Sequence, residues 1–69
     1  MKMLSGRELE IIRHTACGFT AKEIAKMTGL EPRTVQTHVE NIRRKLVARN
    51  TPHAVFIASR EHMLEEAAN

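Results

Sequence analysis

The chain has 69 residues, 42% hydrophobic and 28% charged, which suits one small globular domain and excludes a disordered or fibrous class. Its single cysteine, Cys17, cannot form an intrachain disulfide, and no apolar run approaches the roughly 18 residues that a membrane-spanning helix needs. We therefore expect one domain over residues 1–69, soluble and cytoplasmic, with no membrane partner.

Positive charge is concentrated in the third quarter of the chain. The formal net charge is +3, from 11 Lys and Arg against 8 Asp and Glu. Residues 33–49 include five basic residues and one acidic residue, whereas residues 60–69 include one basic and three acidic residues. This distribution favours a polyanion bound on one face of the protein.

Two capping boxes predict the starts of two short helices. Ser5 stands three residues before Glu8, and Thr20 stands three residues before Glu23. At this spacing the two side chains of each pair satisfy backbone N–H groups that a helix start leaves free. With stops at the next glycines, the helices should span about residues 5–17 and 20–28. Their inward faces should carry Leu9, Ile12 and Ala16 in the first helix, and Ile24, Ala25 and either Met27 or Thr28 in the second.

Two prolines predict the starts of two further helices, because a helix tolerates proline in its first turn. Pro32 opens a helix over about residues 32–46, and Pro52, with Thr51 as its cap, opens one over about residues 51–64. No stretch alternates apolar and polar residues as a strand does, and no Asn-Gly or Asp-Gly hairpin turn is present. The predicted fold class is all-α, a domain like a four-helix bundle.

The helix predicted over residues 32–46 has an apolar and a polar face. At about 100° per residue, the apolar stripe contains Val35, Val39, Ile42 and Leu46. The polar face carries Arg33, Gln36, Thr37, Glu40, Asn41 and Arg44. Any surface helix shows a polar face, but here a short helix and a tight turn at Gly29 come before it. Together they predict a helix-turn-helix unit, whose second helix enters the major groove of DNA as the recognition helix.

Three side chains of this helix are candidates for contacts to base edges. Gln36 can pair with adenine through two hydrogen bonds, the methyl group of Thr37 can touch that of thymine, and Glu40 can accept from the amino group of cytosine. A carboxylate turned toward phosphate would be repelled. Glu40 therefore also supports an alternative function, an interaction module that pairs with a transcription regulator and binds DNA weakly or not at all.

The last predicted helix has a second exposed face. Ala54, Ile57 and Ala58 point one way, which is inward, and the opposite side carries Pro52, Phe56, Ser59 and Met63. Two interpretations stay open for that side: a contact with the tail of the chain, or a homodimer about a two-fold axis. A dimer would match a pseudo-palindromic operator with half-sites about one helical turn apart.

Three stretches carry a resemblance to the LuxR-type helix-turn-helix domain, found at the C-terminus of many bacterial transcription regulators. They are Leu4-Ser5-x-Arg7-Glu8, Gly18-x-Thr20-x-Lys22-Glu23-Ile24-Ala25 and Thr34-Val35-x-Thr37-His38-Val39-x-Asn41-Ile42-x-x-Lys45-Leu46. Two short matches follow them, Arg49-Asn50 and Ala54-Val55. The resemblance covers residues 4–58, nearly the whole chain. It implies a tetrahelical DNA-binding domain that is usually dimeric on DNA, acts in the bacterial cytoplasm and on its nucleoid, and has RNA polymerase as a further candidate partner.

The resemblance also assigns contacts to individual positions. Base contacts fall to Gln36, Thr37 and Glu40. Phosphate contacts fall to Thr20, Lys22, Arg33, Thr34, Arg44, Lys45 and Arg49. The stretch His14-Thr15-Ala16 resembles the quorum-sensing branch, in which a further domain binds an acyl-homoserine lactone, although family members that consist of this domain alone are also known.

Three residues depart from the family pattern. Gly6 replaces a common proline, and Glu31 replaces a small hydroxyl cap, so both should weaken helix starts slightly. Val47 stands where glycine commonly follows Lys-Leu, which leaves the turn between the last two helices open.

Other function classes are disfavoured. No histidine stands at a recognised metal or catalytic spacing from a cysteine or carboxylate; the four are His14, His38, His53 and His62. We therefore expect no enzyme, no metal and no cofactor. The only aromatic residues, Phe19 and Phe56, are too few for base stacking on single strands. A sigma-factor-like promoter-binding region is a further alternative, but Thr37-His38-Val39 looks less like that group.

Overall fold

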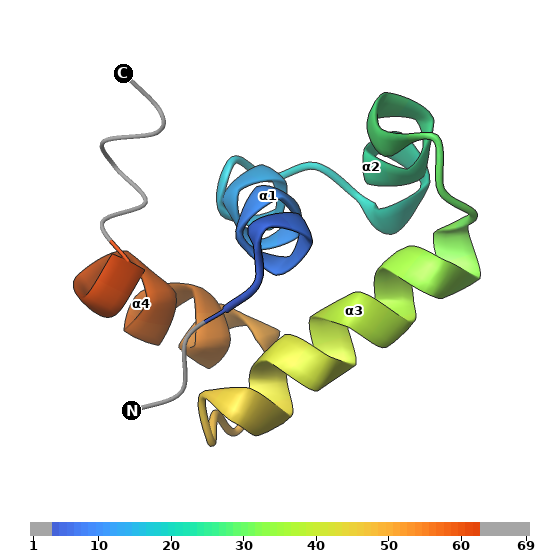
Figure 1. Cartoon of the computed structure of the whole chain (residues 1–69). Helices are drawn as coiled ribbons and strands as arrows, with labels where there is room; N and C mark the ends of the chain where they lie inside the picture. The colour runs from blue at the N-terminus through green and yellow to red at the C-terminus, as the bar shows by residue number, and fades with distance from the viewer. Residues whose placement is uncertain (1–3, 63–69) are drawn as a thin grey trace.

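Four helices make up the computed structural model, which describes residues 4–62. They are α1 (Gly6–Ala16), α2 (Ala21–Thr28), α3 (Pro32–Lys45) and α4 (Thr51–His62) (Figure 1). The described residues contain no strand, so the all-α class is confirmed and each predicted helix is found. The predicted end of the last helix at residue 64, and Met63 with it, lie outside the described residues.

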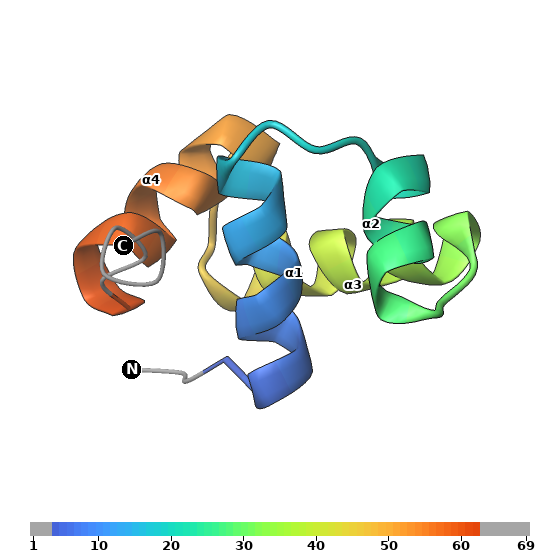
Figure 2. The same cartoon turned by 90° about the horizontal axis from the view of Figure 1, so that it is seen from above.

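Helix α1 lies between α2 and α4, and α3 runs across all three. Seen from above, α2 and α4 flank α1 on opposite sides (Figure 2). The start of α3 lies beside α2 and its end lies beside α4 (Figure 1). Because α3 packs against every other helix on one side, its other side is left for solvent or a ligand.

Both predicted capping boxes are confirmed. At the start of α1, the Glu8 N–H donates to Ser5 Oγ at 3.2 Å, and the Ser5 N–H donates to Glu8 Oε1 at 2.8 Å. At the start of α2, the same two hydrogen bonds join Thr20 and Glu23, also at 3.2 and 2.8 Å. The starts of α1 and α2 are therefore set by pairs of residues three positions apart in the sequence.

Helix α1 ends at the predicted glycine through a Schellman motif. Gly18 has a left-handed backbone with φ of 92°, and its N–H donates to the Thr15 carbonyl at 3.0 Å. The Phe19 N–H donates to the His14 carbonyl at 3.2 Å. This pair of bonds satisfies carbonyls that the last turn of a helix leaves free, and the positive φ suits glycine.

Helix α3 ends in the same motif, built on a valine. Val47 has φ of 54° and is the one non-glycine residue with positive φ among residues 4–62. Its N–H donates to the Arg44 carbonyl at 3.1 Å, and the Ala48 N–H donates to the Arg43 carbonyl at 2.9 Å. A β-branched residue is disfavoured in this conformation. The turn between α3 and α4, which could not be predicted from the sequence, is therefore strained at Val47.

The prediction that Thr51 caps the last helix is wrong, because Asn50 does so. The Asn50 side-chain oxygen accepts from the His53 N–H at 2.9 Å, and its carbonyl accepts from the Ala54 N–H at 3.0 Å. Asparagine is among the strongest N-cap residues, and Pro52 is tolerated in the second helical position because first-turn N–H groups have no partner within the helix.

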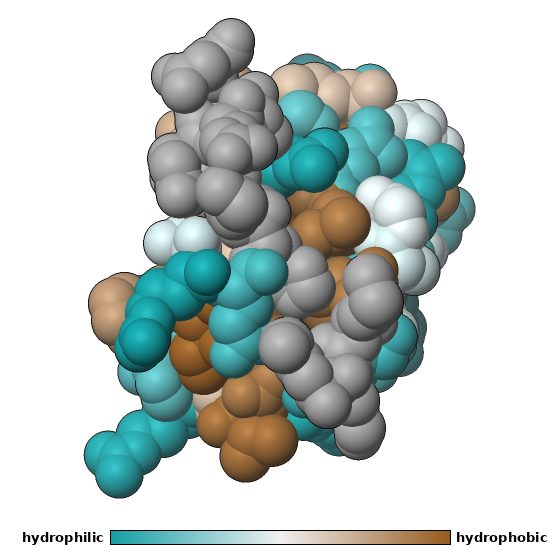
Figure 3. Space-filling view, turned by 60° about the vertical axis from the view of Figure 1, so that its left-hand side comes forward, coloured by the Kyte–Doolittle hydropathy of each residue, from teal (hydrophilic) through white to brown (hydrophobic). Residues whose placement is uncertain are grey.

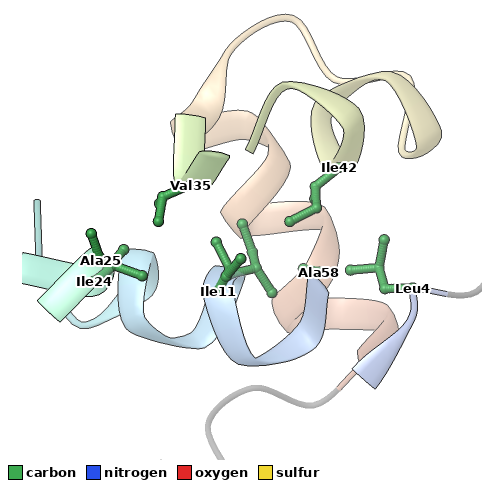
Figure 4. Packing of buried hydrophobic residues seen from close by; sticks show 8 residues of the cluster. Leu4, Ile11, Ile24, Ala25, Val35, Ile42 and Ala58 are labelled. Atoms are coloured by element: carbon green, nitrogen blue, oxygen red, sulfur yellow. The ribbon is translucent and has the colours of Figure 1, made fainter. Parts of the chain in front are cut away.

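Five large aliphatic side chains are completely or almost completely buried: Ile11, Ile12, Ile24, Val35 and Ile42. Ile11 lies in the middle of the cluster, with Ile24, Ala25 and Val35 on one side and Ile42, Ala58 and Leu4 on the other (Figure 4). Ala54 and Ala58 are buried as predicted.

One inward assignment in α1 is wrong, and the choice between two residues in α2 is decided by the structure. Ala16 is exposed, because the buried side of α1 is centred on Ile11 and Ile12 and Ala16 is its last residue. Of the two options in α2, Met27 is 47% exposed, whereas Thr28 is half-buried. The Thr28 hydroxyl donates to the Ile24 carbonyl at 2.8 Å, so its polar group needs no water.

A buried carboxylate joins α1 to α3. Glu8, which is only 6% exposed, accepts at Oε1 a hydrogen bond from Lys45 Nζ at 2.8 Å. Burial alone would raise the pKa of the Glu8 carboxyl, but the hydrogen bonds from Lys45 and from the Ser5 N–H hold it below its ordinary value. The carboxylate is therefore charged at neutral pH and fixes the end of α3 against the start of α1.

Candidate nucleic-acid interface

The polar face of α3 lies outward, as predicted. Burial of Val35 and Ile42 turns one side of the helix into the core, with Val39 and Leu46 partly buried beside them. The opposite side lines a single shallow depression formed by Arg33, Gln36, Thr37, Glu40, Asn41 and Arg44. The six residues predicted to share a face therefore do so.

The turn before α3 is built as expected for a helix-turn-helix. Gly29 caps α2 with φ of 76°, and its N–H donates to the Ala25 carbonyl at 2.9 Å. Glu31 occupies the cap position of α3 but makes no side-chain capping hydrogen bond, in line with the weak start that its side chain predicts. Pro32 then begins the helix.

Gln36 and Thr37 are both exposed at the N-terminal half of the polar face. The Thr37 hydroxyl donates to the Arg33 carbonyl at 3.1 Å, within the helix. Because this hydroxyl already has a partner, an apolar contact of the Thr37 methyl group would leave no donor unsatisfied. The side-chain amide of Gln36 has no such internal use among the described residues, so both its donor and its acceptor can serve a ligand.

Glu40 is bound by two arginines. Its carboxylate accepts from Arg43 Nε at 3.1 Å and from Arg43 Nη2, and it accepts from Arg44 Nε at 3.2 Å. The hydrogen bond from Arg43 lowers the pKa of Glu40, and the same bond raises the pKa of Arg43. The carboxylate therefore stays charged on the polar face, with two positive groups beside it.

The residues predicted to contact phosphate fall into two groups and one exception. Thr20 and Lys22, at the start of α2, line a pocket that also includes Lys26 and Pro32. Arg33, Thr34, Arg44 and Arg49 are exposed on α3 and just after it. The exception is Lys45, whose ammonium group bonds to Glu8 and whose side chain is 38% exposed.

Two basic residues near this surface were not singled out from the sequence. Lys26 lies one helical turn after Lys22 and lines the same pocket, as their spacing of four residues could have indicated. Arg43 was counted as a charge without a role. Its spacing of three residues from Glu40 could have predicted the ion pair, but not its second contact, a hydrogen bond to the Ala48 carbonyl at 2.8 Å.

The predicted dimer face of α4 is partly exposed. Phe56 is 56% exposed, Pro52 is exposed and Ser59 is half-buried. The Arg60 guanidinium lies 5.7 Å from the centre of the Phe56 ring. Figure 3 shows the side of the molecule on which α4 lies, and there hydrophilic side chains stand between the apolar ones. The fourth predicted member, Met63, lies outside the described residues.

No group of three or more His, Cys, Asp or Glu residues in the part of the chain that the structure describes is arranged to hold a metal ion. Among residues 4–62 there is also no helix that could span a bilayer.

Known proteins are similar to most of the chain. Residues 2–58 match the family described as bacterial regulatory proteins, luxR family. The response regulator protein VraR of Staphylococcus aureus is 36% identical over 64 residues, and VraR of Staphylococcus saprophyticus and of Staphylococcus epidermidis are equally similar. Each alignment covers 93% of this chain and 31% of the relative, so the chain spans about a third of the length of these relatives.

Proposed function

Because the chain belongs to the luxR family of bacterial regulatory proteins, we propose that it binds specific sequences of double-stranded DNA with α3 in the major groove. A DNA-binding domain of a transcription regulator is what the family and the VraR relatives support. The observation that carries the finer proposal is the polar face of α3, six residues in one depression on the side opposite the buried Val35 and Ile42. In the bacterial cell such a domain acts in the cytoplasm, on the nucleoid.

Base reading falls to the exposed N-terminal half of α3, through Gln36 and Thr37. Phosphate contacts flank it, from Thr20, Lys22, Arg33, Thr34, Arg44 and Arg49. Lys45 can add to them only with the N–H groups that its bond to Glu8 leaves, because an ammonium group has three donors.

Two copies would bind a pseudo-palindromic operator through α4. The exposed Phe56, with Pro52 and Ser59 on the same helix, supports this pairing. The test is Phe56→Glu on a duplex with two half-sites, with Ala16→Glu as the control that adds the same charge at an exposed position of α1. We expect Phe56→Glu to abolish cooperative binding and leave single half-site binding unchanged. Equal cooperativity in both variants would exclude α4 as the interface.

The experiment that tests DNA recognition is selection of bound duplexes from a random pool, followed by titration of the best site at several salt concentrations. We expect an enriched motif and an affinity that falls steeply with salt, because phosphate contacts release counterions. Gln36→Ala should relax preference at one base pair and cost about 1–3 kcal/mol on the best site, whereas Arg33→Ala should weaken all sequences alike. No enrichment and only weak binding would instead support the interaction module.

Two classes of controlling signal are supported, and the evidence for one is stronger than for the other. The resemblance to the quorum-sensing branch rests on the three residues from His14 to Ala16, whereas the match to proteins named response regulators covers 93% of this chain. We therefore favour a response-regulator system, and RNA polymerase remains a candidate partner of the DNA-bound form.

A further inference from the structure

The polar face of α3 carries an ion-pair network that the proposed base contacts do not use. Arg43 makes a bidentate contact with the Glu40 carboxylate: Nε donates to Oε1 at 3.1 Å and Nη2 donates to Oε2. Arg44 Nε donates to the same Oε2 at 3.2 Å. Both carboxylate oxygens thus accept hydrogen bonds from arginine in the free protein, three in all, which leaves only one acceptor site, on Oε1, for a further donor such as the amino group of cytosine.

Arg43 is fixed to the turn that follows α3. Its Nη1 donates to the Ala48 carbonyl at 2.8 Å, and its own carbonyl accepts from the Ala48 N–H at 2.9 Å. Ala48 is only 4% exposed, and the side chain of Arg43 is 30% exposed. The guanidinium group of Arg43 is thus bound to Glu40 and to the Ala48 carbonyl at the same time, and the backbone of Arg43 is bound to Ala48 as well. Arg43 therefore holds Glu40 in place and is not available to contact DNA.

Arg44 is bound at one edge only. Its side chain is 70% exposed, and of its three side-chain nitrogens only Nε has a hydrogen-bond partner within residues 4–62. A guanidinium group is planar and presents its donors at fixed edges. When Glu40 binds Nε, the edge formed by the two terminal amino groups is left for a ligand, and two oxygens of one phosphate can accept from that edge.

We propose that Glu40 is a positioning residue, which is anchored to the turn after α3 through Arg43 and holds the Arg44 guanidinium ready for a phosphate of the DNA backbone. This inference rests on the proposed placement of α3 in the major groove. Fixing a long side chain before binding reduces the entropy lost on binding, which is how a residue that touches no DNA raises affinity. Glu40 then contributes affinity for every sequence and preference for none.

The test changes the side-chain length and the charge of Glu40 separately. Glu40→Asp keeps the negative charge and shortens the side chain by one methylene, so it cannot span both arginines, whereas Glu40→Gln keeps the length and removes the charge. A matched control is Glu10→Asp, in the pair of the same spacing that Glu10 forms with Arg7 on α1 at 3.1 Å. Affinity for the selected duplex is measured by fluorescence anisotropy at temperatures where circular dichroism shows each variant folded.

We expect Glu40→Asp and Glu40→Gln each to weaken binding about three- to tenfold on all sequences alike, the cost of ordering one free arginine side chain on binding. Arg44→Ala should lose at least as much, because the phosphate contact itself is removed, and the double variant Glu40→Asp with Arg44→Ala should be no weaker than Arg44→Ala alone. Base preference should not change, and Glu10→Asp should bind as the unmodified chain does.

Three results would overturn this role for Glu40. Tighter binding by Glu40→Gln would show that the carboxylate only competes with DNA for the arginines. A changed preference at one base pair in Glu40→Asp would make Glu40 a base-reading residue, and unchanged affinity in both variants would leave it without any role in binding. Failure of the unmodified chain to select any duplex is a separate outcome, because it would overturn the proposed function itself.

Discussion

The two ends of α3 are built in opposite ways. At its start, Glu31 occupies the cap position without a side-chain hydrogen bond. At its end, Lys45 bonds to the buried Glu8 of α1, and Arg43 bonds to the carbonyl of Ala48. The polar side-chain contacts of the helix are thus concentrated at the end away from Gln36 and Thr37, whereas its start is held by the apolar packing of the buried Val35. Binding residues can therefore change at the lightly capped end without disturbing the polar contacts that hold the helix.

The largest effect should come from removing the link at the end of α3. Lys45→Met leaves the carboxylate of Glu8 buried without its cation, and we expect a loss of about 2 kcal/mol in the free energy of unfolding. The value is below that for a fully buried pair because the Lys45 side chain is 38% exposed. Chemical denaturation measures it, and Lys26→Met, at an exposed lysine of α2, is the control. Equal losses in the two variants would show that the link contributes nothing specific.

Acid should weaken the same link. The pKa of Glu8 lies below its ordinary value of 4.5 in the folded protein, so the folded state takes up the proton less readily than the unfolded chain. The stability it contributes is complete above the unfolded pKa and is lost as the pH falls through the folded one. Glu40, whose pKa is lowered by Arg43, acts in the same direction. We expect the melting temperature to fall between about pH 5 and pH 3, and less steeply in Lys45→Met. Parallel curves would contradict this assignment to Glu8.

A smaller gain is expected at the turn after α3. Val47 is 84% exposed and has φ of 54°, so replacing it by glycine removes strain and loses no packing. We expect Val47→Gly to stabilise the protein by about 1 kcal/mol, after the greater freedom of glycine in the unfolded chain is subtracted. Gly18→Val, at the equivalent position of α1, should have the opposite sign. A destabilised Val47→Gly variant would mean that the valine side chain makes a contact that offsets the strain.

The smallest effect should come from the start of α3. Glu31→Asp keeps the charge and places a shorter side chain where it can accept from the first turn, which we expect to add about 0.5 kcal/mol to the free energy of unfolding. Thr20→Ala, which removes a working cap from α2, is the reference for the loss of such a bond. No gain in Glu31→Asp would indicate that Pro32 already fixes this start.

Features that depend on residues close together in the chain could be predicted from the sequence. Ser5 and Glu8 are three residues apart, and so are Thr20 and Glu23, so the starts of α1 and α2 follow from local spacing. The stripe of Val35 and Ile42 fixed which side of α3 faces outward, because a helical period relates them. The capping role of Asn50 was also local, but Thr51 beside Pro52 gave a competing signal.

Contacts between distant residues could not be found in this way. Glu8 and Lys45 are 37 residues apart, and only the packing of α1 on α3 brings them together. Glu8 was therefore recognised as a capping residue and Lys45 as a phosphate contact, without the bond between them. The contact of Arg43 with Ala48 depends on the left-handed backbone of Val47, which residue type alone would not predict.

The Schellman motifs and capping boxes also have a consequence for how fast the domain folds. Each joins residues at most five apart, so both ends of α1, the start of α2 and the end of α3 can form while the chain is still open. Proteins dominated by such local contacts fold within microseconds to milliseconds, because little loop-closure entropy is lost before contacts form. The bond from Lys45 to Glu8 closes a loop of 37 residues and can form only when α3 docks. We therefore expect this bond to form late, in which case Lys45→Met should speed unfolding more than it slows folding.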